Sequence, residues 1–330
     1  MATKIIPMSE KYRNKLVDYM HQIYPSFSDA YIQFDVNEAI GTIEKGTKSL
    51  IVINDNDEIV GCHLNFITKA WINGVEKDVV WGHNTYLDEE HRRTIGLDFT
   101  LEINSIKDGF GYNLTDVNTK IQKLFKTNVF VKGLRLYSIY KWSVFWGAIY
   151  KIIGRIPAIP TELPLYVSTR KDSYKQCNSV KDLNIPNGGY WNREVCDVDF
   201  IRDEVFLTKR FFENPVNKYY VYTNRNKNCY FSVRPILHNG VLALQIADCR
   251  YVPHQSQIAF DIFKAIENLC VKIHAGVILF ATSDKLFHNY FYGRKTCKSW
   301  PISLVCGKNN ASSIDPYIIV NSADSDGEFH

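Results

Sequence analysis

A basic turn that contains a glycine follows an apolar strand in the N-terminal half of the chain. The strand runs from Asp78 through Trp81, and it is followed by His91-Arg92-Arg93-Thr94-Ile95-Gly96. Unpaired backbone N–H groups at a helix start bind anions, and the two arginines add positive charge. The turn therefore predicts a site for a phosphate-bearing ligand; the alternative is a solvated helix start with a basic surface pair. A helix that opens at Gly96 is predicted by apolar residues at near-helical spacing, Leu97, Phe99, Leu101, Ile103 and Ile106.

This stretch resembles the GNAT family of N-acyltransferases. The resemblance rests on Arg93-Thr94-Ile95-Gly96, on the strand before it, and on the strand from Tyr112 that ends at Asn118. In that family the turn binds the pyrophosphate of acyl-CoA, and the flanking strands part around the pantetheine arm. The family has a second small residue where this chain has Asp98; alternatively, the turn is one residue short and Arg92 takes the leading place. The resemblance implies a cofactor site made by Leu87, Arg92, Arg93, Thr94, Ile95, Gly96, Leu97 and Asn118.

Acyl transfer from a thioester to an amine requires a neutral amine, a stabilised oxyanion and a leaving thiolate. GNAT enzymes usually take a base from the strand before the basic turn, where this chain has His83, Asn84 and Tyr86. His83 is the candidate base, or the conduit to water, because histidine has an ordinary pKa near neutrality. A hydrogen-bonded structural histidine is the alternative. Strand alternation places His83 opposite in facing to Asn84 and Tyr86, and the resemblance makes the backbone N–H near Tyr86 the expected oxyanion donor.

The leaving thiolate has no obvious acid in this sequence. The family often has a tyrosine seven residues after the asparagine, and this chain has Phe125 there. Phenylalanine cannot donate a proton, so we expect the thiolate to take one from water or from the substrate. An amine held at attack distance gains much from positioning alone, so a site without a strong acid or base is workable.

Composition limits the class of protein. The chain has 330 residues, 45% of them apolar, and a net charge of +4, which suits an anionic cofactor and does not indicate nucleic-acid binding. Its eight cysteines show no C-x-x-C spacing, which favours reduced thiols in a cytoplasmic protein over disulfides or a metal site. No signal peptide is expected, and the aromatic run from Trp142 to Tyr150 is too short for membrane insertion.

The two halves of the chain show a weak internal repeat. Helical stretches and β-branched strands lead to the turn Ile72-Asn73-Gly74, and His238-Asn239-Gly240 repeats that turn in the second half. The predicted fold is α/β with a mixed sheet, in two tandem GNAT-like domains, residues 1–167 and 168–330. The alternative is that the halves share only a common α/β meander.

The second half lacks the chemistry of the first at the matching turn. The residues Val252 to Ser256 include neither glycine nor arginine, so a backbone could not approach a pyrophosphate closely. We therefore expect one acyl-CoA site, in the first domain, and a degenerate second domain that binds the amine substrate. Arg210, Arg234 and Arg250 are the candidate ligands for a diphosphate. The chain ends in a strand-like Tyr317 to Val320 and an acidic, flexible segment from Asp324.

The substrate expectation comes from the resemblance. Tandem GNAT proteins of bacterial surface-polysaccharide pathways, such as O-antigen biosynthesis, acylate nucleotide-linked amino sugars. The implied activity is transfer of an acetyl or short acyl group from its CoA thioester to the amine of a dTDP-linked amino-deoxy sugar, without a metal. Two alternatives are a Fem-like transferase that moves an aminoacyl group from tRNA to a cell-wall precursor, and a non-catalytic module that binds acyl-CoA. The sequence leaves the oligomeric state open.

Overall fold

The chain forms two compact units. The first contains Met1–Phe130 and Ser303–Asp315, and the second contains Val131–Ile302 and Pro316–His330. The domain boundary expected between residues 167 and 168 falls inside the second unit, whose sheet takes strands from both sides of that point. The computed structural model describes residues 2–41, 49–106, 109–112, 120, 128–131, 133–140, 152, 154, 157–191, 196–252, 255–291, 294–307 and 317–324.

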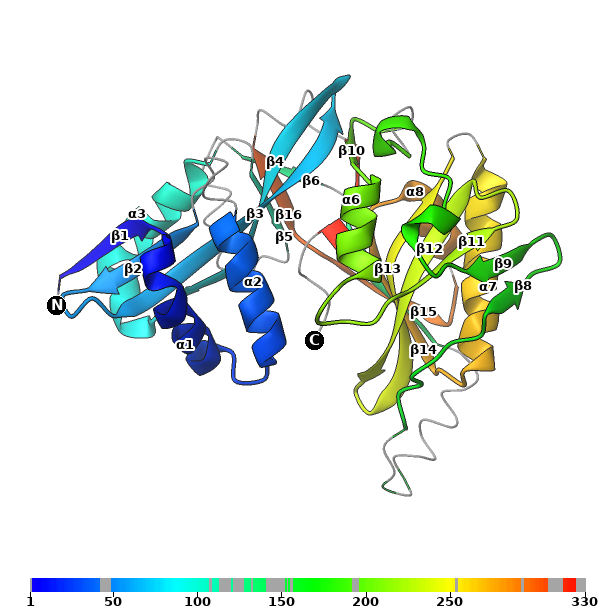
Figure 1. The fold of residues 1–330 in the computed structure, drawn as a ribbon, viewed down its shortest axis with the longest axis horizontal. Helices are drawn as coiled ribbons and strands as arrows, with labels where there is room; N and C mark the ends of the chain where they lie inside the picture. The colour runs from blue at the N-terminus through cyan, green and yellow to red at the C-terminus, as the bar shows by residue number, and fades with distance from the viewer. Residues whose placement is uncertain are drawn as a thin grey trace. The chain divides into compact units, whose positions relative to one another are not determined.

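The sheet of the first unit has the strand order β1-β2-β3-β4-β5-β16-β6 (Figure 1). Strands β4 and β5 pair in parallel, whereas β4 pairs antiparallel with β3. Asn73 and Gly74 have φ angles of 51° and 86°, so the predicted Asn-Gly hairpin turn is confirmed. The strands are β1 (Thr3–Pro7), β2 (Leu50–Asn54), β3 (Ile59–Ile72), β4 (Val75–Leu87), β5 (Gly109–Tyr112), β6 (Asn128–Val131) and β16 (Leu304–Gly307).

Helices cover both faces of this sheet. Figure 1 shows α1 (Arg13–Ile23) and α2 (Asp29–Gly41) on one face and α3 (Arg92–Asn104) on the other. Short 3-10 turns precede α1 and α3, at Glu10–Tyr12 (η1) and Glu89–His91 (η3). Ile95 and Phe99 of α3 pack against Leu50, Val52 and Val60 of the sheet.

The second unit also has a mixed sheet in which one pair of neighbouring strands is parallel. Its sheet has the order β15-β7-β14-β13-β12-β11-β9-β8, and β13 and β14 are its parallel pair. The strands of this sheet are β7 (Arg135–Tyr140), β8 (Tyr166–Ser168), β9 (Ser173–Gln176), β11 (Tyr220–Asn224), β12 (Cys229–His238), β13 (Val241–Tyr251), β14 (Val277–Thr282) and β15 (Cys297–Pro301). Two further strands, β10 (Val198–Phe200) and β17 (Ile318–Ile319), are not part of it and pair with each other in parallel. The helical segments of the unit are η4 (Val180–Asp182), η5 (Asn187–Gly189), α6 (Glu204–Leu207), the π-helix η6 (Thr208–Phe212), α7 (Ser256–Lys272), α8 (Lys285–Phe291) and η8 (Ser322–Asp324).

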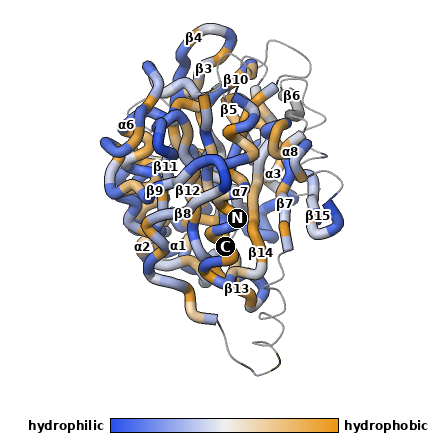
Figure 2. The backbone as a smooth tube through the Cα atoms, turned by 90° about the vertical axis from the view of Figure 1, so that its right-hand side faces the viewer, coloured by the Kyte–Doolittle hydropathy of each residue, from blue (hydrophilic) through white to orange (hydrophobic). Residues whose placement is uncertain are grey.

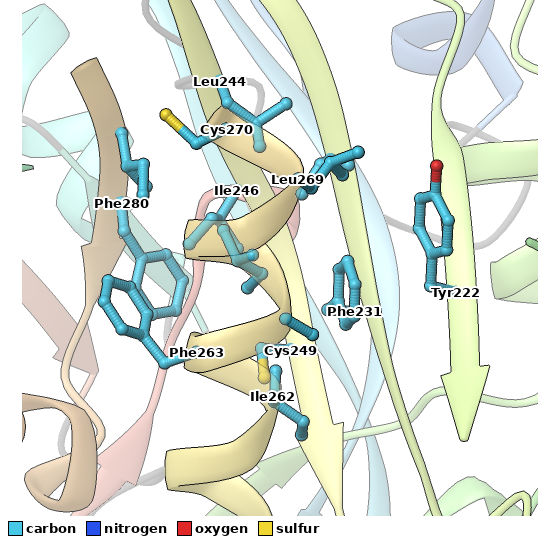
Figure 3. Close-up of a cluster of buried hydrophobic side chains, with 14 of the residues drawn as sticks. Tyr222, Phe231, Leu244, Ile246, Cys249, Ile262, Phe263, Leu269, Cys270 and Phe280 are labelled. Carbon is cyan, nitrogen blue, oxygen red and sulfur yellow. The ribbon is translucent and has the colours of Figure 1, made fainter. Parts of the chain in front are cut away.

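Apolar side chains between α7 and its sheet form the main core of the second unit. Hydrophobic residues lie along β13 and β14 (Figure 2). By contrast, the tip of the β3–β4 hairpin in the first unit is hydrophilic. Figure 3 shows side chains of α7 pointing towards those of the strands, among them Ile262, Phe263, Leu269, Cys270, Phe231, Leu244 and Ile246. Among the described residues, no helix combines the length and the apolar character that a membrane span requires.

The two sheets also receive strands from distant parts of the chain. Strand β7 follows β6 along the chain yet pairs with β14 and β15 of the second unit. Conversely, β16 follows β15 along the chain and pairs with β5 of the first unit. The chain therefore crosses between the units more than once, and the sheet of the first unit is complete only when residues near the C-terminus are in place.

We predict that Leu304→Ala destabilises the first unit. Leu304 is 0% exposed in β16 and pairs with Tyr112 of β5, so its truncation leaves a cavity in the core that costs about 2–5 kcal/mol. Denaturant unfolding would measure the loss, and hydrogen exchange would assign it to amides of β1–β5. Leu165→Ala, at a side chain that is 62% exposed, is the control. A change below about 0.5 kcal/mol at Leu304 would contradict the assignment of β16 to this sheet.

Candidate functional site

The parallel pairing of β4 and β5 ends before β4 does. The paired residues are Val80–Gly82 of β4 and Gly109–Gly111 of β5, and β4 continues to Leu87. The residues predicted for catalysis and cofactor binding lie at this end of β4 and in the turn that follows it. Asn118 and Phe125 lie outside the described residues, so their predicted roles remain predictions.

A β-bulge sits in β4 at the point where pairing with β5 ends. Leu64 of β3 pairs with His83, but Cys62 pairs with Tyr86, so β4 contains one extra residue. Asn84 adopts a left-handed conformation there, with φ 43°. The alternation of side chains is broken, and the prediction that His83 and Asn84 face opposite sides is wrong, because both side chains contact one carboxylate.

That carboxylate belongs to Asp35 on α2. Its Oδ1 lies 2.5 Å from Nε2 of His83, and its Oδ2 accepts a hydrogen bond from the side-chain amide of Asn84. The side chains of Asp35 and His83 are only 2% and 7% exposed. Sequence reasoning missed Asp35, although the signal was present: it shares the buried face of α2 with Ile32, Val36 and Ala39, where a charged residue needs a partner.

A second buried histidine lies beside the first. Nδ1 of His63 is 2.7 Å from Oγ1 of Thr85, and the ring packs so closely on Gly82 that a Cβ there would lie 2.7 Å from it. Burial, and then the charge of His83, lower the pKa of His63 from 6.5 to about 3. His63 is therefore neutral at physiological pH, and Gly82 provides the space for its ring.

Aromatic side chains of the α1 region pack around Tyr86. The rings of Tyr19 and Tyr24 each lie 6.4 Å from that of Tyr86 in edge arrangements, and the Arg92 guanidinium lies 5.7 Å from it. The backbone amide of Tyr86 lies against the thiol of Cys62 on β3. An oxyanion would have to displace this contact, so the donor role of Tyr86 stays a prediction.

The basic turn differs from its prediction. Helix α3 begins at Arg92 and follows the 3-10 turn Glu89–His91 directly, so the prediction of a helix that opens at Gly96 is wrong. Glu89 and Glu90 favour a helix start, since carboxylates stabilise its positive end. The buried face of α3 consists of Ile95 and Phe99, whereas Leu97 is 68% exposed.

The groups that could hold a phosphate lie at the start of α3. Neither Asp88 nor His91, at the N-caps of η3 and α3, makes a side-chain capping hydrogen bond. Arg93 and Thr94 are exposed, whereas Nε of Arg92 donates to the carbonyl oxygen of Leu87 at 2.8 Å. Asp88, Glu89 and Glu90 bring negative charge to the same end of the helix, so the exposed Arg93 and the backbone amides must attract an anion against these carboxylates.

In the second unit, the C-terminal segment lies where β13 and β14 part, which corresponds to the point where β4 and β5 part in the first unit. Pairing of β13 with β14 ends at Ile246, beside a bulge in β13 that lies opposite Ser232–Val233 of β12, and β13 continues to Tyr251. Asn321 forms an isolated bridge with Thr282, the last residue of β14, and donates from Nδ2 to Asp248 of β13 at 2.7 Å. The chain itself thus fills the space between the parting strands.

A buried ionic network fixes this segment. Arg202 donates to Asp248 at 2.7 Å and to Asp324 at 2.5 Å, and all three side chains are at most 1% exposed. Burial raises the pKa of Asp248, but the charges of Arg202 and Arg250 outweigh it and hold that pKa below its usual range. The prediction that the acidic segment is flexible from Asp324 is therefore wrong for Asp324 itself.

The three predicted diphosphate arginines are not brought together as one open site. Arg250 is 0% exposed and lies 3.7 Å from both Asp248 and Asp324. Arg234 is 9% exposed and donates to Gln245 at 3.0 Å, while Arg210 is partly buried in η6. In this conformation Arg250 has no access to a nucleotide.

Comparison with known proteins shows similarity in fold. No protein-family model matches the sequence, and no curated protein matches it. A conserved protein of unknown function from Enterococcus faecalis V583, described as a probable N-acyltransferase, has a TM-score of 0.59 at 9% identity over 92% of this chain and 72% of that chain. A GCN5-related N-acetyltransferase from Kribbella flavida has a TM-score of 0.59 at 12% identity over 92% and 70%.

An acyl-CoA complex is among the similar structures. Saccharomyces cerevisiae N-myristoyltransferase with bound myristoyl-CoA has a TM-score of 0.56 at 9% identity over 93% of this chain and 79% of that chain. Each comparison covers both units. The chain therefore has the mixed α/β fold of GNAT-type N-acyltransferases, and the predicted fold class is confirmed.

We predict that His63 makes the first unit less stable in acid. Between pH 6.5 and about 3 the unfolded chain binds a proton at His63 that the folded chain does not, so the unfolding free energy falls as the pH falls. The slope is at most about 1.4 kcal/mol per pH unit. Hydrogen exchange of β3 and β4 amides at pH 7 and pH 5 measures it. His63→Gln should flatten the slope and His238→Gln should not; equal slopes in the two variants would exclude this cause.

Proposed function

We propose that the first unit binds acyl-CoA at the β4–α3 turn and transfers its acyl group to an amine. The observation that carries this proposal is the local geometry on a GNAT-type fold: β4 outruns its parallel partner, bulges at Asn84, and leads into an α3 start without a side-chain cap. Backbone amides at a helix N-terminus bind phosphate, so the pyrophosphate belongs at this corner.

The cofactor roles fall on two kinds of group. The backbone amides of Arg93 and Thr94 in the first turn of α3 would face the pyrophosphate, Gly96 in the next turn would leave space for it, and the Arg93 side chain would supply a charged donor. Arg92 holds the carbonyl of Leu87 and so shapes the turn. Ile95 contributes only its backbone, because its side chain is 8% exposed in the core. Asn118 is the proposed contact of the pantetheine arm.

The identities of the acyl donor and of the acceptor amine are further proposals. The myristoyl-CoA complex among the similar structures makes a long acyl chain a second donor to test beside acetyl-CoA. We retain a dTDP-linked amino sugar as the proposed amine. Arg210 and Arg234 of the second unit are its proposed diphosphate ligands; Arg250 is not one of them, because it is fully buried. The eight cysteines are free, which supports the proposal of a cytoplasmic enzyme.

We predict that Arg93→Ala and Gly96→Ala each weaken CoA binding about tenfold, because a charge-assisted hydrogen bond to phosphate contributes about 1.5–3 kcal/mol and a methyl group obstructs the anion. The fold should tolerate Gly96→Ala, since the new Cβ would meet Leu87 at 3.7 Å. Titration calorimetry with CoA measures both. Arg225→Ala and Gly41→Ala are the controls, at an exposed turn and at a glycine with open space around it. Unchanged affinity in both test variants would remove the phosphate-site assignment.

Release of free CoA thiol tests the reaction itself. The protein is incubated with acetyl-CoA or myristoyl-CoA and with dTDP-linked amino sugars, and the thiol is measured against amine-free controls. Amine-dependent release supports the transferase. CoA binding without release from any amine would instead support the non-catalytic module, and salt-sensitive RNA binding without CoA binding would support the Fem-like alternative.

A further inference from the structure

We infer that Asp35 is a positioning residue for His83, which fixes the tautomer and the orientation of that imidazole for acyl transfer. This inference rests on the proposed function. Sequence patterns did not point to Asp35, because it lies on α2, 48 residues before His83. The geometry that assigns it is the contact of one buried carboxylate with two consecutive residues at the β4 bulge.

The chemistry of the contact determines the tautomer. A carboxylate only accepts hydrogen bonds, so Nε2 of His83, 2.5 Å from Oδ1 of Asp35, carries the proton. A neutral imidazole has one donor and one acceptor nitrogen, and the lone pair is therefore on Nδ1. The carboxylate also stabilises the imidazolium that forms when Nδ1 takes up a proton.

Helix α2 and the side chain of Asn84 together fix the position of the Asp35 carboxylate. The 13-residue helix α2 holds it in a row of buried residues, and its second oxygen accepts from the side-chain amide of Asn84. Asn84 can reach it because of its left-handed backbone, with φ 43°. The bulge thus brings two donors to one carboxylate, and a regular strand would have turned one of them away.

Three other titratable groups near this pair are neutral at pH 7. His63 of β3 has a pKa lowered to about 3, chiefly by burial. Burial, and then the charge of Asp35, raise the pKa of the Cys62 thiol on β3 to about 12. Burial also raises the pKa of Tyr24, which follows α1. These three neighbours therefore add no charge beside the contact of His83 with Asp35.

This arrangement serves the attack of the amine on the thioester. As the amine nitrogen attacks the thioester carbonyl carbon, its lone pair forms the C–N bond and its proton moves to Nδ1 of His83. The C–S bond breaks, and the CoA thiolate takes a proton from solvent while the imidazolium returns one to solvent. The His83 side chain is 7% exposed, which leaves limited contact with solvent for the return of this proton.

The first test uses the unaltered protein. Nitrogen-15 NMR of its histidines should show His83 protonated at Nε2 and unprotonated at Nδ1 near neutral pH. The Nδ1-protonated tautomer would overturn the inference. This measurement requires neither a variant nor an acyl acceptor, so it gives an answer even if a substituted protein fails to fold.

The second test compares Asp35→Asn with Asp29→Asn, which changes an exposed carboxylate on the same helix. Asp35→Asn should lower kcat more than about tenfold, change the pH dependence of kcat, alter the nitrogen-15 shifts of His83, and leave the Kd for CoA within about twofold. An unchanged kcat and pH profile in Asp35→Asn would overturn the inference. Wild-type protein that binds CoA and acylates no amine would overturn the proposed function, a result recognisable before any variant is made.

Discussion

One extra residue in β4 determines the character of the site. The bulge at Asn84 lies where β4 loses its pairing with β5, and it turns His83 and Asn84 towards the same carboxylate. Without it, strand alternation would place these side chains on opposite faces, and the buried Asp35 would lose one of its donors. An unpaired buried charge is strongly destabilising, so the bulge, α2 and the histidine stabilise one another.

In the second unit a segment of the chain itself lies between the parting strands. This unit has a parallel pair that parts and a bulge at the matching place, but Asn321 bridges the two strands and Asp324 pairs with Arg202. Ion pairs and amide hydrogen bonds thus hold the C-terminal segment between the parting strands of the second unit, at the place that corresponds to the cofactor site we propose in the first unit. The asymmetry between the units supports our proposal that acyl-CoA binds to the first.

The sequence was informative where local patterns determine structure. The β2–β3–β4 meander and both Asn-Gly turns follow from β-branched runs and turn residues. The start of α3 was placed too late because Glu89 and Glu90 extend the helix backwards from the apolar pattern. Three features depend on contacts between residues that are distant in the sequence, which local periodicity does not encode. They are the pairing of β7 with β14 and of β16 with β5, the contact of Asp35 with His83, and the burial of Asp324.

The central claim is that the corner between β4 and α3 of the first unit holds CoA. Hydrogen exchange with and without CoA, resolved along the chain, tests this claim most directly. Our account predicts slower exchange for amides between His83 and Leu97, and no change between Ala247 and Tyr251 of the second unit. Unchanged exchange across the first stretch at saturating CoA, or protection confined to the second unit, would contradict it.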